Sequence, residues 1–409
     1  MAVYYVSKAG NDGSGTGGDI TKPYVTINAA VAAAYGAGTG NIVEIIDSGQ
    51  YDEGDIEIYT NAITVRATGS NTPILDGDDG DEDHTFETYV SGCIFQGLTM
   101  RQYDNQFIKG ANAPGKNFIL SGCIGYAFGG PQYVLGSGGS AEIHECKLVA
   151  ERAAAVDLSA NGHLWINNSL LATNAVGTTI VQSSVSYPNV TASFCTFVGS
   201  GHNNSSGRQY NLIDAVETVI NCIVSGSGNG INAGTSSYNL VNVGADPFLV
   251  YGAASYGGTG GSTVARSANT GEITGDPLFI SGSDPGTEDP EVFGNVNLYT
   301  QDFQLQGASP AIDAGTSYLG VAIDLSGTSR PQGDAPDIGA YEFISGDPIW
   351  SDYSSEPNKK WGSDFSINTT KNMSSNYKYK YDDSNRQAPF SVLSIAKIRG
   401  TTVPYKADK

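Results

Sequence analysis

Charged side chains are scarce in this chain. They make up 15% of its 409 residues, with 42 acidic residues against 21 basic ones. The net charge of −21 argues against nucleic acid and anionic membranes as partners, because their phosphate groups would be repelled. Long apolar runs are also missing, so the sequence offers no candidate for a membrane span of roughly 18 residues. The residues after Met1 lack the basic and apolar regions of a secretory signal peptide.

Cysteine is rare as well. The five cysteines are an odd number, so at least one is unpaired, and none forms the C-x2-C pair that a zinc site needs. Glycine is abundant, with 53 residues, and Ser, Thr and Asn are frequent. This composition indicates short strands separated by many turns.

The cysteines mark a repeat of about 25 residues. Ser169 divides the longest gap between them, and the repeated segments are "YVSGCIFQGL", "ILSGCIGYA", "EIHECKLVA", "WINNSLLA", "TASFCTFVG" and "TVINCIVSG". An apolar or small side chain stands three places before each Cys or Ser, and most segments have another two places after it. Such a period is typical of a solenoid in which each coil pairs with the next. We therefore predict an inert internal stack of Cys93, Cys123, Cys146, Ser169, Cys195 and Cys222, with a disulfide between neighbouring coils as the alternative.

The N-terminal region predicts a cap. "VYYV" after Met1 and Ala2 is a first strand, and "PYVTINAAVAAAYGAG" predicts a short amphipathic helix with Ile27, Val31 and Ala34 on one face, ending near Gly36 or Gly38. Four strand candidates follow: "NIVEIID", "DIEIYT", "AITVRAT" and "TPILDGD". A helix across the first coil would shield a sheet edge that otherwise invites aggregation.

These segments resemble the right-handed parallel β-helix proteins of the pectate-lyase-like superfamily. "GDPLFI" (275–280), "DFQLQGASPAIDAG" (302–315) and "SRPQGDAPDIGAYEF" (329–343) resemble the last coils of its bacterial and phage surface proteins. The resemblance covers about residues 3–345 and implies an all-β fold, a right-handed parallel β-helix (solenoid) with a short N-terminal capping helix. It is specific to the fold and not to an activity.

The expected organisation has three parts. Residues 1–42 hold the first strand and the capping helix, 43–345 form the parallel β-helix with an inserted loop near 251–274, and 346–409 form a small β-rich C-terminal segment. The first 345 residues hold 11 basic and 35 acidic residues, net −24, whereas the remaining residues hold 10 and 7, net +3. We interpret the C-terminal segment as an assembly element through Trp350, Trp361, Tyr377, Tyr379, Tyr381 and Phe390, with a lid over the last coil as the alternative.

No motif identifies a catalytic residue, so the catalytic set stays unknown. The acidic cluster Asp76, Asp78, Asp79, Asp81 and Asp83 is a candidate Ca2+ site, because hard cations bind several oxygens. It lacks EF-hand spacing, and a solvated acidic turn is the favoured interpretation. Candidate glycan contacts in surface loops are Tyr126, Tyr133, Tyr187 and Asn203.

The resemblance and the missing signal peptide together favour a phage-like virion protein, assembled in the host cytoplasm and exposed on the particle surface. We expect a non-enzymatic tail spike, fibre or capsid decoration protein that binds cell-surface polysaccharide. It would be a homotrimer that contacts other virion proteins and requires no cofactor. The alternatives are a polysaccharide lyase or hydrolase (a depolymerase) and a bacterial surface adhesin.

Overall fold

The computed structural model shows two compact units, Met1–Ile349 and Trp350–Lys409. The described residues all belong to the first unit, and the second lies outside them. They are 1–36, 38–77, 84–101, 106–110, 117–127, 133–135, 139–150, 155–158, 163–173, 180–183, 189–199, 211–214, 218–226, 229–233, 235–243, 248–251, 263–265, 267–281, 301–318 and 320–344.

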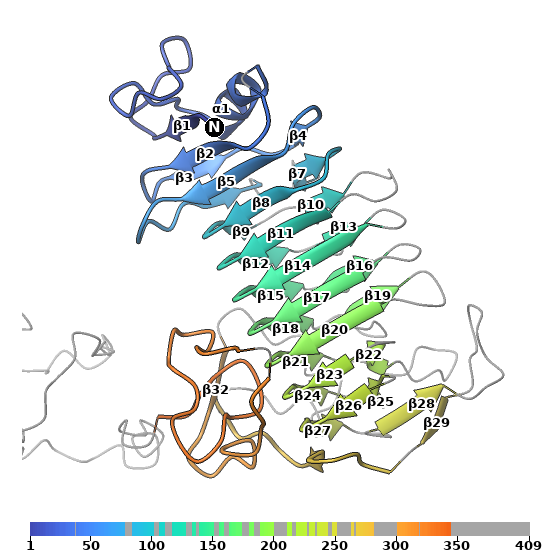
Figure 1. The fold of residues 1–409 in the computed structure, drawn as a ribbon. Helices are drawn as coiled ribbons and strands as arrows, with labels where there is room; N and C mark the ends of the chain where they lie inside the picture. The colour runs from blue at the N-terminus through green and yellow to red at the C-terminus, as the bar shows by residue number, and fades with distance from the viewer. Residues whose placement is uncertain are drawn as a thin grey trace, which may run out of the picture. The chain divides into compact units, whose positions relative to one another are not determined.

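The described residues form three sheets of ten strands, and each turn of the chain adds one strand to each sheet (Figure 1). Sheet A contains β1 (Val3–Val6), β2 (Asn41–Ile45), β5 (Ile63–Ala67), β8 (Cys93–Gln96), β11 (Asn117–Ser121), β14 (Ser140–His144), β17 (His163–Asn167), β20 (Asn189–Ser193), β23 (Thr218–Ile220) and β26 (Thr235–Ser237). Sheet B contains β3 (Gln50–Asp52), β6 (Ile74–Asp76), β9 (Thr99–Arg101), β12 (Ile124–Ala127), β15 (Lys147–Ala150), β18 (Leu170–Thr173), β21 (Thr196–Gly199), β24 (Ile223–Gly226), β27 (Leu240–Val243) and β30 (Ile273–Thr274).

Sheet C contains β4 (Ile56–Ile58), β7 (His84–Thr88), β10 (Gln106–Gly110), β13 (Tyr133–Leu135), β16 (Val156–Leu158), β19 (Val181–Ser183), β22 (Asn211–Asp214), β25 (Asn229–Asn232), β28 (Phe248–Tyr251) and β29 (Thr263–Ala265). Only β29 runs antiparallel to its neighbour among these described strands. The predicted parallel β-helix is therefore confirmed. Part of the stretch expected to be an inserted loop, 251–274, is β structure, because β29 and β30 extend sheets C and B.

Alternate side chains of each strand fill the interior. One register line of sheet A passes from Val65 through Phe95, Leu120, Ile143 and Ile166 to Ala192, and all six are buried. Because side chains alternate across a strand, the residues between them face outward. This alternation places every second side chain of each strand on the outer surface of the β-helix.

Two-residue turns join sheets A and B in successive coils. The first residue of each turn has positive φ, as in Glu145 (56°), Asn168 (48°) and Phe194 (51°). The second points inward, and there the thiols of Cys146, Cys195 and Cys222 each donate to the carbonyl two residues earlier. All five cysteines are free and buried, so the disulfide alternative is wrong, and the predicted internal stack is confirmed for Cys123, Cys146, Ser169, Cys195 and Cys222.

Cys93 does not belong to this stack, which corrects the sequence alignment. It is the first residue of β8 and pairs in register with Phe118, inside sheet A. Leu98 takes the corresponding turn position of that coil, where its carbonyl accepts from Ile124 N. The sequence pattern misled because both positions face the core, and a buried thiol is equally suited to either.

The N-terminal cap agrees with expectation. Helix α1 (Ile27–Tyr35) buries Ile27, Ala30, Val31 and Ala34 and ends at Gly36. The Glu53 carboxylate accepts from the Ile27 and Asn28 amides at 3.0 Å each, which satisfies two donors at the helix start. No helix among the described residues is long and apolar enough to cross a membrane.

The described residues of 275–344 do not add strands to the three stacked sheets, contrary to the last coils that the resemblance implied. In their described part, β31 (Phe279–Ser281) and β32 (Asp302–Leu305) form an antiparallel pair, and the chain then runs along the outside of sheet B (Figure 1). Phe279, Phe303, Leu305, Ala311 and Ile338 of this segment pack on outward side chains of sheet B, namely Val149, Leu170, Ala172, Val198, Ile223 and Leu240. The apolar residues of 302–343 indicated in the sequence that this stretch is buried, but not that it is buried against the outer side of a sheet.

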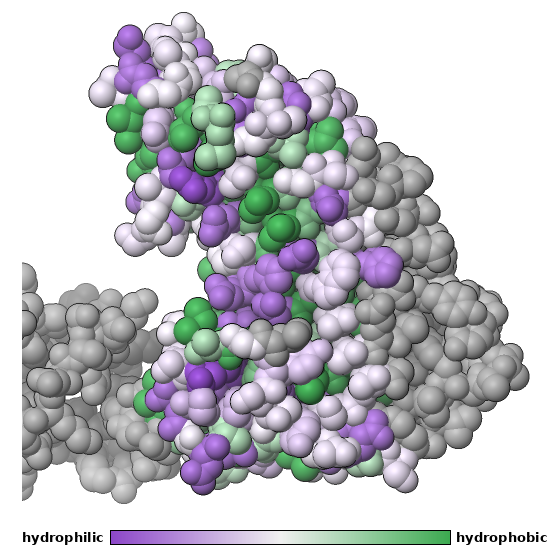
Figure 2. Space-filling model, viewed as in Figure 1, coloured by the Kyte–Doolittle hydropathy of each residue, from purple (hydrophilic) through white to green (hydrophobic). Residues whose placement is uncertain are grey.

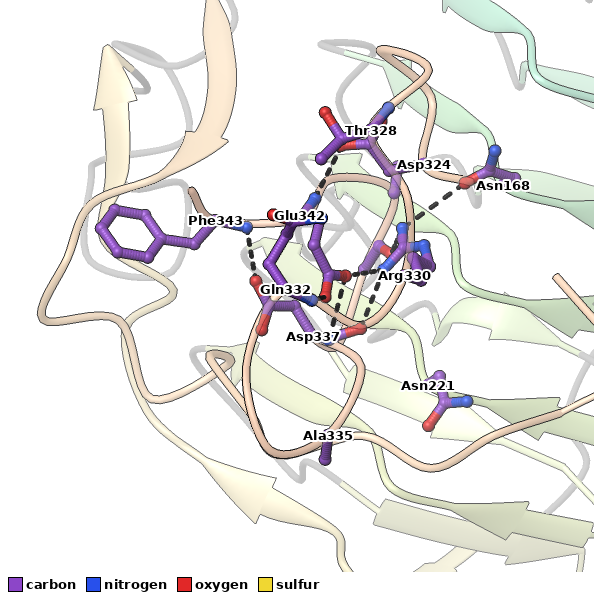
Figure 3. Close-up of polar contacts among 12 residues, drawn as sticks. Asn168, Asn221, Asp324, Thr328, Arg330, Gln332, Ala335, Asp337, Glu342 and Phe343 are labelled. Atoms are coloured by element: carbon purple, nitrogen blue, oxygen red, sulfur yellow. Dashed lines mark hydrogen bonds and ion pairs between the residues drawn. The ribbon is translucent and has the colours of Figure 1, made fainter. Parts of the chain in front are cut away.

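A buried polar cluster fastens this C-terminal segment to the coils (Figure 3). Arg330 lies between Glu342 and Asn168, which come from the segment and from a turn of the β-helix. Asn221, a second turn residue, accepts from Thr316 N at 2.9 Å and donates to Thr316 O at 2.6 Å. The described part of the segment thus covers the C-terminal half of sheet B, whereas Trp165 on the outer face of sheet A is exposed.

Candidate functional site

The outward face of strands β14 and β17 carries a cluster of polar and aromatic side chains. Their inward neighbours, including Ile143 and Ile166, are buried, so strand alternation turns the residues between them to solvent. The outward residues are Glu142, His144, His163, Trp165 and Asn167. We call this cluster, together with Thr191 and Ser193 of β20, the Trp165 site.

Trp165 is the centre of the site. It is 41% exposed, which is unusual for a large apolar side chain. The His163 ring stacks beside it, with ring centroids 5.8 Å apart and planes at 18°. In register, Trp165 lies between Glu142 on one neighbouring strand and Thr191 on the other. The indole therefore offers an accessible ring surface with polar side chains on both sides.

Glu142 and His144 form a carboxylate–imidazole pair in the site. His144 Nε2 lies 3.0 Å from Glu142 Oε2, on the same strand and the same face. Glu142, His144, Trp165, Asn167, Thr191 and Ser193 line a shallow hollow of about 280 Å³, together with Ile166. Its walls combine one aromatic ring with carboxylate, imidazole, amide and hydroxyl groups, a mixture suited to a ligand with both apolar and hydroxylated faces.

A second group of functional side chains lies at the N-terminal end of sheet C. Glu57 and Glu87 occupy neighbouring strands in register. Tyr59 and Tyr89 stack beside them, with centroids 4.5 Å apart and planes at 21°. The hydrogen bond from the Tyr59 phenol to Glu57 raises the pKa of Tyr59 above its ordinary value.

His84 joins this second group. Its Nδ1 lies 3.3 Å from Asp55 Oδ1 and its Nε2 lies 3.3 Å from Glu87 Oε2. The side chain is held by carboxylates on both sides and is largely buried. Within the described part of the chain, no group of three or more His, Cys, Asp or Glu side chains is arranged to hold a metal ion.

The structure does not gather the sequence-predicted site residues into one place. Asp76 pairs with Arg101, with 2.7 Å between Oδ2 and Nη2, so one of its oxygens is occupied by a cation of the protein itself. The other proposed Ca2+ ligands, Asp78, Asp79, Asp81 and Asp83, lie outside the described residues. The Ca2+ site therefore stays a prediction.

Of the predicted glycan contacts and assembly residues, the structure describes the side chain of Tyr126 alone. Tyr126 lies on sheet B and packs against the apolar cluster beneath the C-terminal segment, away from the Trp165 site. Tyr133 lies in β13, but its side chain is outside the described residues, as are Tyr187 and Asn203. The assembly residues Trp350, Trp361, Tyr377, Tyr379, Tyr381 and Phe390 also lie outside them.

Sequence reasoning missed Trp165 and His163, although the signal was present. In "HLWIN" the apolar Leu164 and Ile166 alternate with His163, Trp165 and Asn167. Since Ile166 faces inward and side chains alternate along a strand, its neighbour Trp165 must face outward. What the sequence did not show is that Glu142 stands beside it, since that pairing depends on the register between coils.

Comparisons with known proteins give a distant likeness. No protein-family model matches the chain, and no curated protein matches it. Among solved structures it is similar to pectate lyase Pel9A, with 15% identity and a TM-score of 0.44 over 83% of this chain and 96% of that one. It is also similar to a pectin methylesterase from Aspergillus niger, with 14% identity and a TM-score of 0.38 over 59% of this chain and 84% of that one. This likeness is too distant to assign a function to the chain.

Proposed function

We propose that the protein is a glycan-binding β-helix and that the Trp165 site holds the sugar. The observation that carries this proposal is the exposed Trp165 ring, flanked by His163 and by the hydrogen-bonding side chains of the 280 Å³ hollow. The C–H bonds of a pyranose ring carry partial positive charge and pack on the negative face of an aromatic ring. Its hydroxyl groups need donors and acceptors at the rim, and Glu142, Asn167 and Thr191 supply them.

The charge of the chain limits the class of glycan that it is able to bind. The first 345 residues carry a net charge of −24, from 11 basic and 35 acidic residues, and the described site itself contains a carboxylate. A polyanionic glycan would be repelled, so a neutral sugar fits better. Binding without catalysis fits the site, because Glu142 is the one carboxylate among the described residues that line the hollow, and hydrolysis of a glycosidic bond ordinarily requires two.

The test is a glycan array probed with the wild-type chain and with Trp165→Ala. We expect the wild type to bind neutral glycans and the variant to lose at least about tenfold in affinity. Trp165→Phe, which keeps a ring, should retain part of the binding. Ile280→Ala is the matched control, since Ile280 is 43% exposed but lies on β31, away from the site.

Equal binding by wild type and Trp165→Ala would reject the site. Thermal unfolding of each variant separates loss of binding from loss of folding. Because Trp165 contributes an exposed surface, its removal should leave the unfolding temperature within a few degrees of the wild type.

We infer further that this glycan binding serves a phage-like particle as a spike, fibre or decoration protein. The support is the β-helix scaffold together with the change of charge from net −24 to net +3 at residue 346. Opposite charge on the two parts of the chain favours association between copies. Light scattering of the full chain should give three times the 42.6 kDa chain mass, and a monomer would contradict the assembly part of the proposal.

An enzymatic function is the second candidate, and the outward line of sheet C favours it. Glu57 and Glu87 occupy neighbouring register positions, and His84 Nε2 lies 3.3 Å from Glu87 Oε2, which brings carboxylates and an imidazole together on this side of the sheet. A lyase requires a basic residue to abstract a proton beside a uronate carboxylate. Incubation with polygalacturonate, with and without Ca2+, tests this: formation of unsaturated products by wild type and not by His84→Gln would favour the lyase.

A further inference from the structure

A second hollow lies on the same outer face of sheet A, closer to the N-terminus. It has a volume of about 420 Å³, and its lining comes from β2, β5, β8, β11 and the turns that follow them. Arg66 and Glu44 form an ion pair across it, with 2.8 Å between Nη2 and Oε1. The charges of Arg66 and Glu44 therefore largely neutralise each other, and the carboxylate of Glu145 is a further charge in the lining of the hollow.

The two hollows meet at strand β14. Glu142 and His144 of this strand line the smaller hollow, and Glu145, the next residue, lines the larger one. One outward side chain from each coil follows the boundary between sheets A and B without interruption. In register these are Glu44, Arg66, Gln96, Ser121, His144, Asn167 and Ser193, which we call the polar line.

A second register line runs parallel to the polar line and is more apolar. It passes through Ile94 and Ile119 to Glu142 and then Trp165. Ile94 and Ile119 are half-buried on the outer face. Figure 2 shows this as a hydrophobic patch over β8 and β11, with a hydrophilic patch beginning beside it at β14. Apolar side chains thus lie beside the polar line at Ile94, Ile119 and Trp165, and Glu142 separates the two isoleucines from the indole.

We propose that this surface is one continuous groove that binds an extended stretch of neutral glycan along the axis of the β-helix, across the strands. The inference rests on the proposed glycan function of the Trp165 site and adds a second contact region to it. Neighbouring strands lie about 4.8 Å apart, so the polar line presents a hydrogen-bonding group at each such step over about 24 Å from β2 to β17, and Ser193 on β20 is buried. A sugar chain carries hydroxyl groups on its edges and C–H groups on its faces at every unit, which matches the two lines.

Charge identifies the class of glycan. Along the polar line the acidic Glu44 is paired with Arg66, and Glu142 lies against His144. Glu145 adds a further carboxylate to the lining of the larger hollow. A polyuronate would place a negative charge on each unit against these carboxylates, whereas a neutral chain is not repelled.

The experiment measures how affinity depends on chain length. Isothermal titration uses dimers to hexamers of three neutral β-1,4-linked series, glucose, mannose and N-acetylglucosamine, with oligogalacturonides of the same lengths as the anionic comparison. We expect at least one neutral series to bind the full chain about tenfold or more tightly as the hexamer than as the dimer. Oligogalacturonides should bind more weakly at every length.

Variants measure the contribution of each hollow to binding separately. The double variant Gln96→Ala/Ser121→Ala removes two hydrogen-bonding side chains of the polar line in the larger hollow. Its affinity for the hexamer should fall to that for the dimer, and its affinity for the dimer should equal that of the wild type. Trp165→Ala should reduce both. Thr235→Ala is the matched control, because Thr235 is exposed on β26 of the same sheet but outside both hollows.

The outcomes distinguish this inference from the proposed function. Affinity that does not rise with length, together with loss of binding in Trp165→Ala, would overturn the groove and leave the Trp165 site standing. Binding of all lengths that is indifferent to Trp165→Ala, or no binding of any neutral series, would overturn both. Preference for oligogalacturonides would overturn the assignment to neutral glycan.

Discussion

Arg330 Nη1 lies 2.8 Å from Glu342 Oε2, and both side chains are fully buried. Arg330 Nη2 also donates to Gly339 O at 2.8 Å, and the guanidinium carbon lies 4.7 Å from the centre of the Phe194 ring. Phe194 belongs to a turn of the β-helix, whereas Glu342 and Gly339 belong to the C-terminal segment. This single cation therefore joins two parts of the chain that are far apart in sequence.

Replacement of Arg330 by Met should be strongly destabilising. It leaves the buried Glu342 carboxylate without its cation, close to Asp324 and Asp337, and breaking a buried pair in this way costs about 3–5 kcal/mol. Urea unfolding of the full chain measures the loss. Arg66→Met is the control, since the Arg66–Glu44 pair is only partly buried and should contribute less, about 1 kcal/mol. Equal losses in the two variants would show that the Arg330 cluster does not fasten the segment.

Asp337 should make stability depend on pH. Burial raises the pKa of the Asp337 carboxyl to about 6 in the folded protein, above its ordinary value near 3.9. The folded state then binds this proton more tightly than the unfolded state, so the contribution of Asp337 to stability is fully present at low pH and is lost as pH rises through about 6. The facing titratable groups are Glu342, Asp324 and Arg330.

Urea unfolding at pH 4.5 and pH 6.5 tests this in wild type and Asp337→Asn. The variant cannot ionise, so it should lack the change that Asp337 supplies, on the order of 2 kcal/mol. Comparing the two proteins removes the contribution of all other titrating groups. Identical pH dependence in both would mean that Asp337 titrates normally.

The five cysteines should be unreactive in the folded protein. All are buried, and burial raises the pKa of the Cys93 thiol to about 11 and that of Cys222 above its ordinary value. Since the thiolate is the reactive form, an alkylating reagent should label none of them in the native state and all five after unfolding in denaturant. Mass spectrometry counts the labels, and any rapid native labelling would contradict the internal stack.

The turns between sheets A and B can be tested through their backbone conformation. Gly122 and Glu145 hold the same position in successive coils with φ of 63° and 56°. A side chain at such a φ costs about 1 kcal/mol, so Gly122→Ala should destabilise by about that amount although its added methyl group meets only ordinary contacts. Glu145→Gly relieves the same strain and should be neutral or slightly stabilising. Thermal unfolding compares the pair, and a strong loss in Glu145→Gly would contradict this account.

Much of the fold followed from local sequence patterns. The period of about 25 residues, the two-residue alternation and the Ala-rich stretch at 27–35 predict stacked coils and a capping helix, because burial of alternate side chains is a property of each strand by itself. The sequence also determined that Trp165 faces outward, since its neighbours Leu164 and Ile166 must face inward.

Tertiary structure decided what depends on contacts between distant segments. Cys93 and Cys123 look alike in sequence, but the register of β8 against β11 puts Cys93 in a strand and Cys123 in a turn. The stretch 302–343 reads as buried, yet only packing shows that it is buried against the outside of sheet B. The groove likewise arises from the register of seven coils, which brings Glu44 and Ser193 onto one line across the sheet. Sequence specifies which side of a strand each residue occupies, while pairing between strands decides which residues become neighbours.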